Sequence, residues 1–177
     1  MRITGGTLAG RQVKVPPGEI RPAMDKMRES VFAVLGDLSG LSFLDLFSGS
    51  GIIALEAASR GADYIEAVEM DPLKRKILID NVQISPHRIN CKFVPVELYV
   101  KRAKQGFDII FCDPPFPYKH KWELVASICN SILVKTNTVL LLHRPRNETA
   151  INPDPCMTRE DTREYGRSVV DFINFKK

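Results

Sequence analysis

Long apolar runs are missing from this chain of 177 residues. No stretch approaches the roughly 20 consecutive apolar residues that a membrane-spanning helix needs. The residues after Met1 also lack the apolar core of a secretory signal. These absences argue against a membrane protein, and they predict a cytoplasmic protein with no membrane partner.

Cysteine pairs of the kind that bind zinc are absent as well. The chain has four cysteines and three histidines, and no two cysteines form a Cys-x-x-Cys pair. The residues concerned are Cys91, Cys112, Cys129, Cys156, His87, His120 and His143. Their wide spacing predicts no metal site and implies no disulfide. Cys112 lies in an apolar stretch, so we expect it in the core.

What is present is the composition of an ordinary globular domain. Hydrophobic residues make up 44% of the chain and charged residues 26%. A chain of this length has room for a sizeable core, so we expect one domain spanning residues 1–177. We expect this domain to be a monomer.

Basic charge is unevenly distributed. The formal net charge is only +4, but residues 1–30 carry six basic and three acidic side chains, and residues 101–121 carry five and two. Basic charge therefore gathers in the N-terminal segment and around residues 113–116, which favours a polyanionic substrate. Basic residues scattered over a solvated surface would give similar counts, so charge alone leaves both interpretations open.

Apolar runs alternate with helical patterns along most of the chain. Residues 2–15 are typical of a small β-hairpin, and we expect residues 1–20 to form a basic appendage that covers another part of the molecule. Asp71 and Pro72 have the types favoured at the N-cap and first position of a helix. The predicted helices are 24–36, 52–59, 72–84, 97–104 and 121–134. The predicted strands are 43–47, 64–69, 92–96, 107–112 and 138–142, followed by an antiparallel pair at 156–163 and 168–175.

This alternation predicts an α/β fold with a doubly wound, mostly parallel, Rossmann-like sheet that ends in an antiparallel hairpin. In such sheets, ligands bind beyond the carboxyl ends of the strands. The polar and glycine residues at or just past these ends are Asp45, Gly49, Gly51, Glu69, Glu97 and Asp113. We therefore expect these residues to form one binding face.

A glycine turn follows the first predicted strand of the sheet. Residues 49–54 match the G-x-G-x-x-G/A nucleotide-binding pattern, and Glu69 lies twenty residues beyond Gly49. Gly49 and Gly51 would let a ligand approach the backbone, and Glu69 could accept hydrogen bonds from both ribose hydroxyls. Ser48 and Ser50 are candidate ligand contacts or simply small turn residues. The pattern alone is compatible with NAD and with S-adenosylmethionine (SAM).

Two features favour SAM. Asp45 precedes the turn by four residues, where a carboxylate suits the methionine ammonium and would repel a pyrophosphate. The chain also has no residues placed for hydride transfer. Glu97 could accept a hydrogen bond from the adenine amino group, although a carboxylate at a helix N-terminus is an equally good interpretation.

An acidic and proline-rich corner follows the strand predicted at 107–112. Asp113 and the Pro114 carbonyl could accept the two hydrogens of a planar exocyclic amine, and Phe116 could stack on the ring that carries it. Pro114 and Pro115 keep this corner stiff. The amine of such a ring is a poor nucleophile because its lone pair is delocalised, and accepting both N–H groups favours the pyramidal nitrogen that attacks. An ordinary Asp-Pro turn is the alternative.

A ring of this kind fits a nucleic-acid base turned out of its stack. Tyr118 could then help Phe116 to replace the lost stacking. Basic residues of the N-terminal segment could hold phosphates without reading sequence. The candidate phosphate contacts are Arg2, Arg11, Lys14 and Arg21.

Several motifs resemble those of the RsmD family, the bacterial SAM-dependent 16S rRNA (guanine-N2)-methyltransferases. The matching stretches are residues 2–6, 10–11, 17–18, 21–22, 25–32, 44–51, 55–62, 107–116 and 165–166. The resemblance implies a class I methyltransferase sheet and methyl transfer by direct SN2 attack. The implied partner is 16S rRNA or the small ribosomal subunit. It also implies that SAM binds around residues 44–51 and that Asp113, Pro114, Pro115 and Phe116 act in catalysis.

The chain departs from the family pattern at three places. Ala23 stands where Thr is usual, Phe116 where Tyr is frequent, and residues 142–144 lack an expected Glu. Other possible functions are amino methylation of DNA adenine or of a protein amide, a non-catalytic RNA-binding relative, and an NAD-type domain. The compact basic N-terminal segment, without a separate target-recognition domain, favours RNA over DNA. The intact residues 113–116 weigh against the last two alternatives.

Overall fold

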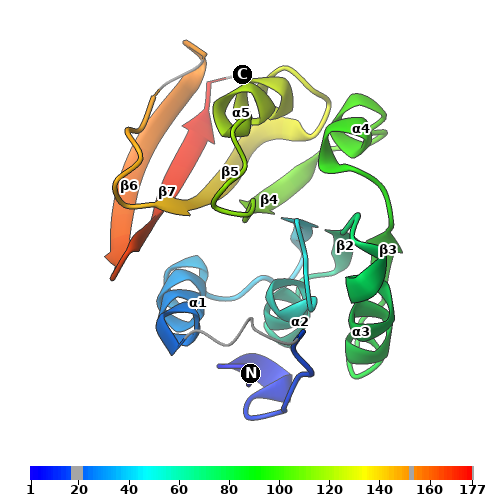
Figure 1. Cartoon of the computed structure of the whole chain (residues 1–177). Helices are drawn as coiled ribbons and strands as arrows, with labels where there is room; N and C mark the ends of the chain where they lie inside the picture. Colours follow the sequence, from blue (N-terminus) through cyan, green and yellow to red (C-terminus); the bar gives the residue numbers. More distant parts are fainter. Residues whose placement is uncertain (17–21, 152–153, 177) are drawn as a thin grey trace.

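The computed structural model describes residues 1–16, 22–151 and 154–176, with the side chains of residues 22 and 23 outside that description. Within these residues the chain forms one seven-stranded sheet in the order β3-β2-β1-β4-β5-β7-β6 (Figure 1). The strands are β1 Ser42–Leu46, β2 Tyr64–Val68, β3 Ile89–Lys92, β4 Phe107–Cys112, β5 Val134–Pro145, β6 Met157–Tyr165 and β7 Ser168–Phe175. The helices are η1 Gly6–Leu8, α1 Pro22–Leu35, α2 Ile52–Ser59, α3 Pro72–Val82, α4 Val96–Lys101 and α5 Lys121–Cys129.

The sheet is mostly parallel and is covered on both faces. β1 to β5 pair in parallel, whereas β7 runs antiparallel to both β5 and β6. The N-terminal segment packs with α1, α2 and α3 on one face, and α4 and α5 cover the other (Figure 1). The predicted doubly wound fold with a C-terminal antiparallel hairpin is confirmed. Strand order reverses between β1 and β4, and in such folds this is where ligands bind.

The central strands are apolar because both of their faces are buried. In β1, Phe43 packs with the core on the α2 side, whereas Leu44 and Leu46 pack with the core on the α5 side. β4 has the predicted bounds, and its Cys112 is fully buried as expected. At the start of α3, the Asp71 side chain accepts a hydrogen bond from the Leu73 N–H at 2.9 Å, with Pro72 at the first helical position. That N-cap was predicted from sequence.

The N-terminal segment folds back on itself as predicted for a small hairpin. An antiparallel bridge joins Arg2 and Gln12, and η1 lies between the two arms. The Ile3 N–H donates to the Arg11 carbonyl oxygen at 3.0 Å, and the Val13 N–H donates to the Met1 carbonyl oxygen at 2.8 Å. The sequence did not predict that Ile3, Leu8 and Val13 are buried in the core beside α1 and α2. Burial of three apolar side chains makes this segment part of the domain.

Three elements differ most from their predicted bounds. β3 begins and ends earlier than predicted, because the chain after Lys92 turns through Pro95 into α4. β5 continues to Pro145, since its pairing with β7 extends to Ser168. α5 ends at Cys129, where the Asn130 side chain donates a hydrogen bond to the Ala126 carbonyl oxygen.

Cys129 and Cys156 are joined as a disulfide between the end of α5 and the start of β6. The expectation that no disulfide is implied was wrong for this pair, because the chain returns beside α5 only after β5. If the disulfide were reduced to thiolates, the two sulfurs and the Asp154 carboxylate would form a group that could hold a metal ion, with ligand atoms within 4.8 Å of one another. Sequence spacing predicted neither arrangement. Among the described residues, no helix has the length and apolar character needed to cross a membrane.

Candidate active site

The ends of β1 and β4 lie side by side. Leu46 and Cys112 are register partners, and the Asp113 N–H donates a hydrogen bond to the Leu46 carbonyl oxygen at 3.3 Å. The glycine turn therefore leaves the sheet next to the Asp-Pro-Pro-Phe corner. The structure thus brings together the two motifs that the sequence analysis assigned to a cofactor and to a reacting amine.

The glycine turn is tightly closed. The Gly51 N–H donates to the Ser48 carbonyl oxygen at 2.8 Å, and the Ser48 hydroxyl donates to the Asp45 carbonyl oxygen at 2.8 Å. Gly49 and Gly51 have φ values of 54° and 79°, and a Cβ at Gly51 would meet Leu78 Cδ1 at 2.5 Å. Phe47 is also left-handed, with φ 64°, a conformation that is uncommon outside glycine and was not predicted here.

Glu69 connects this turn to the start of α3. Its carboxylate accepts hydrogen bonds from the Gly49 N–H and the Asp71 N–H, each at 2.8 Å. Glu69 is buried, and it holds two loops that flank the predicted ribose position. This positioning role was not predicted, and the ribose contact stays a prediction.

Asp45 is buried directly beneath the turn. Its carboxylate accepts a hydrogen bond from the Ala54 N–H at 3.2 Å. Burial, and secondarily the negative charge of Asp113, raises the pKa of Asp45 well above its usual value. Two carboxylates placed so close together favour a ligand that brings positive charge.

The Asp113 corner is held from two sides. The Tyr118 N–H donates to the Pro115 carbonyl oxygen at 2.8 Å, which closes the proline turn. Asp113 Oδ1 lies 2.6 Å from His143 Nδ1, on the neighbouring strand β5. The partly exposed Phe116 ring meets the His143 ring edge-on, with centroids 5.6 Å apart. The sequence analysis missed His143, and its only signal was the absence of the Glu expected at 142–144.

Glu97 and Tyr118 contact each other, although the sequence analysis assigned one to the cofactor and the other to the substrate. The Tyr118 hydroxyl donates a hydrogen bond to Glu97, and its ring packs against Phe47 with centroids 5.5 Å apart. Burial and the Glu97 carboxylate raise the pKa of Tyr118. These contacts place Tyr118 beside Glu97, which was predicted to bind the cofactor, so the predicted role of Tyr118 in stacking on the base gains no support from the structure.

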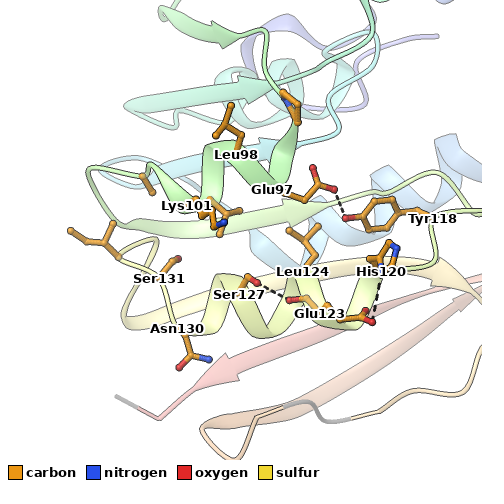
Figure 2. Close-up of a pocket in the computed structure, with 14 residues that line it drawn as sticks. Glu97, Leu98, Lys101, Tyr118, His120, Glu123, Leu124, Ser127, Asn130 and Ser131 are labelled. Atoms are coloured by element: carbon orange, nitrogen blue, oxygen red, sulfur yellow. Dashed lines mark hydrogen bonds and ion pairs between the residues drawn. The ribbon is translucent and has the colours of Figure 1, made fainter.

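Glu97 and Tyr118 stand at one end of a groove between α4 and α5 with a volume of about 800 Å³. Figure 2 shows the two side chains pointing toward each other, with Leu124 and Ser127 further along α5. The groove continues to Asn130 and Ser131 at the end of that helix. It therefore adjoins the proposed adenine end of the site.

Of the four basic residues predicted to hold phosphates, the structure describes three. Arg2, Arg11 and Lys14 are exposed, and Lys14 forms an ion pair with Asp80 at 3.3 Å. Arg21 lies outside the described residues.

The sequence analysis also missed Asn81, which ties the N-terminal segment to the glycine turn. Its side-chain amide donates to the Lys14 and Ser50 carbonyl oxygens, each at 2.8 Å, and accepts from the Lys14 N–H at 3.1 Å. The Lys14 backbone therefore lies next to the glycine turn.

Comparisons with known proteins agree with this geometry. The family model described as "Conserved hypothetical protein 95" matches residues 1–174. The chain is 26% identical over 165 residues to the Ribosomal RNA small subunit methyltransferase D of Haemophilus influenzae, covering 87% of this chain and 83% of that protein. It is 29% identical over 177 residues to the Putative rRNA methyltransferase YlbH of Bacillus subtilis, covering 94% of each.

The fold also matches solved structures. One described as "Putative methyltransferase yhhF from Escherichia coli" superposes with a TM-score of 0.90 over 99% of this chain and 98% of that one, at 24% identity. This likeness confirms the Rossmann-like architecture.

Proposed function

Because the chain belongs to the RsmD family, we propose that it is a SAM-dependent rRNA methyltransferase that acts on the exocyclic N2 amine of a guanine in 16S rRNA. The observation that carries the proposal is the pairing of β1 with β4. This pairing sets a buried acidic and glycine-rich turn beside a rigid Asp-Pro-Pro-Phe corner.

The residues at the end of β1 fit SAM. Asp45 suits the methionine ammonium, because it is a buried carboxylate whose pKa is raised by burial and by Asp113. Gly49 and Gly51 put no side chain between a ligand and the backbone of the turn, and we expect Glu69, which accepts a hydrogen bond from the Gly49 N–H, to accept hydrogen bonds from the ribose hydroxyls. Glu97, which accepts a hydrogen bond from the Tyr118 hydroxyl, would accept one from the adenine amino group. When bound, SAM supplies an electrophilic methyl group.

The corner after β4 orients the accepting amine. One oxygen of Asp113 is held by His143, which leaves the other for an amine N–H, and the Pro114 carbonyl accepts the second N–H. Phe116, which is 37% exposed, stacks on the base. As the nitrogen forms its bond to carbon and the carbon–sulfur bond breaks, positive charge moves onto nitrogen, where the Asp113 carboxylate stabilises it. The methylated nitrogen then loses its extra proton to water.

The RNA is held mainly through its phosphates. Arg2, Arg11 and Lys14 are exposed cations of the N-terminal segment, and Lys14 is tied to the cofactor turn through Asn81. Arg21 belongs to the same basic segment. Phosphate contacts of this kind fix the position of an RNA without reading its sequence, so the choice of guanine falls to the Asp-Pro-Pro-Phe corner.

Nucleoside analysis by mass spectrometry tests this function in cells. We expect 16S rRNA from cells that carry the gene to contain a methylated guanine that is lost when the gene is deleted and restored by the wild-type gene. Unchanged methylation after deletion would contradict the proposal, and loss of a methylated adenine would assign the enzyme to another amine. Calorimetry with SAM and with NAD separates the two cofactors independently.

A further inference from the structure

His143 lies directly beside Asp113, the proposed catalytic carboxylate. It follows Leu142, the register partner of Cys112, just as Asp113 follows Cys112, so the two residues face each other across β4 and β5. The imidazole Nδ1 lies 2.6 Å from Asp113 Oδ1, and the His143 side chain is 5% exposed. In the part of the chain that the structure describes, the buried Nε2 has no hydrogen-bond partner.

We propose that His143 is a positioning residue for methyl transfer, which donates its Nδ1–H to Asp113 Oδ1 and thereby turns Oδ2 toward the substrate amine. This inference rests on the proposed function. An ionised carboxylate only accepts hydrogen bonds, so the shared proton belongs to Nδ1. In the neutral imidazole, Nε2 then carries no hydrogen.

The unpartnered Nε2 argues against a purely structural role. Buried polar atoms are normally hydrogen-bonded, and leaving one unpaired destabilises the fold. The next residue, Arg144, shows what a structural side chain looks like here: its guanidinium binds both oxygens of buried Asp171 and donates to the Glu148 carbonyl oxygen. In His143, only the ring nitrogen that faces Asp113 has a hydrogen-bond partner among the described residues, so the side chain is oriented toward that carboxylate.

The same imidazole also contacts the stacking ring. Phe116 meets it edge-on with ring centroids 5.6 Å apart, while Asp113 is bound through Nδ1. His143 therefore fixes the position of the Asp113 carboxylate, which accepts an amine hydrogen, relative to the Phe116 ring, which stacks on the base. Reaction rates depend steeply on such placement, because the amine nitrogen must approach the methyl carbon in line.

Three substitutions of His143 separate positioning from structure. In His143→Asn the side-chain amide N–H can take the place of Nδ1–H. In His143→Gln the amide lies nearer the position of Nε2. His143→Leu has no polar atom at either position. We expect the Leu and Gln variants to lose about 10- to 100-fold in kcat, with KM for SAM changed less than about threefold. The Asn variant should recover most of the lost turnover. Because Nε2 is unpartnered, the denaturant midpoint of the Leu variant should equal or exceed that of the wild type.

The outcomes distinguish this inference from the proposed function. If the wild type methylates rRNA and the Leu variant keeps kcat within twofold, positioning by His143 is wrong while the function stands. A lower denaturant midpoint together with lost activity and no recovery in the Asn variant would make His143 structural and overturn the inference.

If the wild type transfers no methyl group to rRNA, the proposed function fails and ¹⁵N NMR still decides the hydrogen bond. We expect a spectrum in which Nδ1 carries the proton and Nε2 does not, and which changes in Asp113→Asn. A His143 spectrum that is indifferent to that substitution would overturn the pairing.

Discussion

Two carboxylates at neighbouring strand ends, Asp45 and Asp113, have different surroundings, and the proposed function gives them different tasks. Asp45 is fully buried under the glycine turn, whereas the Asp113 side chain is 22% exposed and bound by His143. The first can meet only a ligand that enters the cofactor turn. The second can meet a group that arrives from solvent, as a nucleic-acid base does.

Removing the second carboxylate should stop transfer without loosening the cofactor. For Asp113→Ala we expect kcat to fall by about 10²- to 10³-fold, because the charge that stabilises the developing cation is gone. The dissociation constant for SAM should change less than about threefold, as measured by calorimetry. Asp161→Ala removes an exposed carboxylate on β6 and serves as the control, with wild-type turnover expected. Near-normal turnover of Asp113→Ala would refute the assignment.

The raised pKa of Asp45 predicts a proton linked to SAM binding. In the folded protein the pKa of Asp45 lies above the ordinary value of 3.8, so folding favours the protonated carboxyl. The protonated carboxyl therefore contributes to stability below pH 3.8, and this contribution is lost as pH rises through the raised pKa. A bound ammonium reverses this preference by favouring the ionised form. Between 3.8 and the raised pKa, SAM affinity should therefore increase with pH and binding should release a proton.

Calorimetry in two buffers of different ionisation enthalpy measures that proton. In Asp45→Asn the proton release should vanish, and SAM affinity above the pH window should fall. Proton uptake on binding, or affinity that strengthens as pH falls through the window, would contradict the placement of the ammonium at Asp45.

At the scale of elements, the turn between β1 and α2 depends on glycine. Gly51 has φ 79°, and an added Cβ would lie 2.5 Å from Leu78 Cδ1, whereas Gly36 at the end of α1 has φ 70° and nothing within 4 Å. Gly36→Ala should cost about 1–2 kcal/mol of unfolding free energy from backbone strain alone. Gly51→Ala should cost about 1–3 kcal/mol more, because Leu78 must move.

Urea unfolding measures both variants, and calorimetry measures their SAM binding. Only Gly51→Ala should weaken SAM, since Gly36 lies outside the proposed site. Equal stability losses in the two variants, or weakened SAM binding in Gly36→Ala, would show that the turn is not packed as described.

A buried ion-pair cluster joins α1, α2 and the N-terminal segment. Glu56 on α2 is fully buried; it accepts a hydrogen bond from the Thr4 N–H at 2.7 Å and from Arg28 Nε at 3.2 Å, and it pairs with Arg60. Arg28 is 1% exposed. Arg28, Glu56 and Arg60 all belong to the motifs that resemble the RsmD family, so that part of the resemblance reflects structure rather than substrate contact.

Neutralising this cluster should destabilise the protein strongly. Glu56→Gln leaves Arg28 and Arg60 without their shared buried charge, and we expect a loss of about 3–5 kcal/mol in unfolding free energy by urea titration. Lys76→Ala breaks the exposed pair with Asp80 and should change stability by less than about 1 kcal/mol. Similar small effects of both variants would mean that the Glu56 cluster is not a buried anchor.

At the scale of the whole molecule, sequence reasoning succeeded where the signal is local. The bounds of α2 and β4 match their predictions. The glycine turn precedes α2, and a glycine and a proline border the apolar run of β4. Sequence reasoning failed for β3, a short edge strand, and it did not predict that three apolar residues of the N-terminal segment join the core with α1 and α2. Tertiary packing decides such contacts, and a short stretch of sequence gives no information about it.

The candidate site divides in the same way. Asp45, the glycine turn, Glu69 and Asp113 could be predicted because each belongs to a short motif at a strand end. His143 lies 30 residues from Asp113, and Asn81 lies 67 residues from Lys14, so their contacts depend on which strands and helices become neighbours. The disulfide between Cys129 and Cys156 was missed for the same reason.

In-vitro methyl transfer with the purified chain, followed by nucleoside mass spectrometry, is the most direct test that the adjoining ends of β1 and β4 form a methylation site. With SAM and unmethylated 16S rRNA or small subunits, the account predicts N2-methylguanosine from the wild type and none above background from Asp113→Ala. The account would be contradicted by a wild type that binds SAM yet methylates neither substrate, or by an Asp113→Ala variant that yields as much product as the wild type.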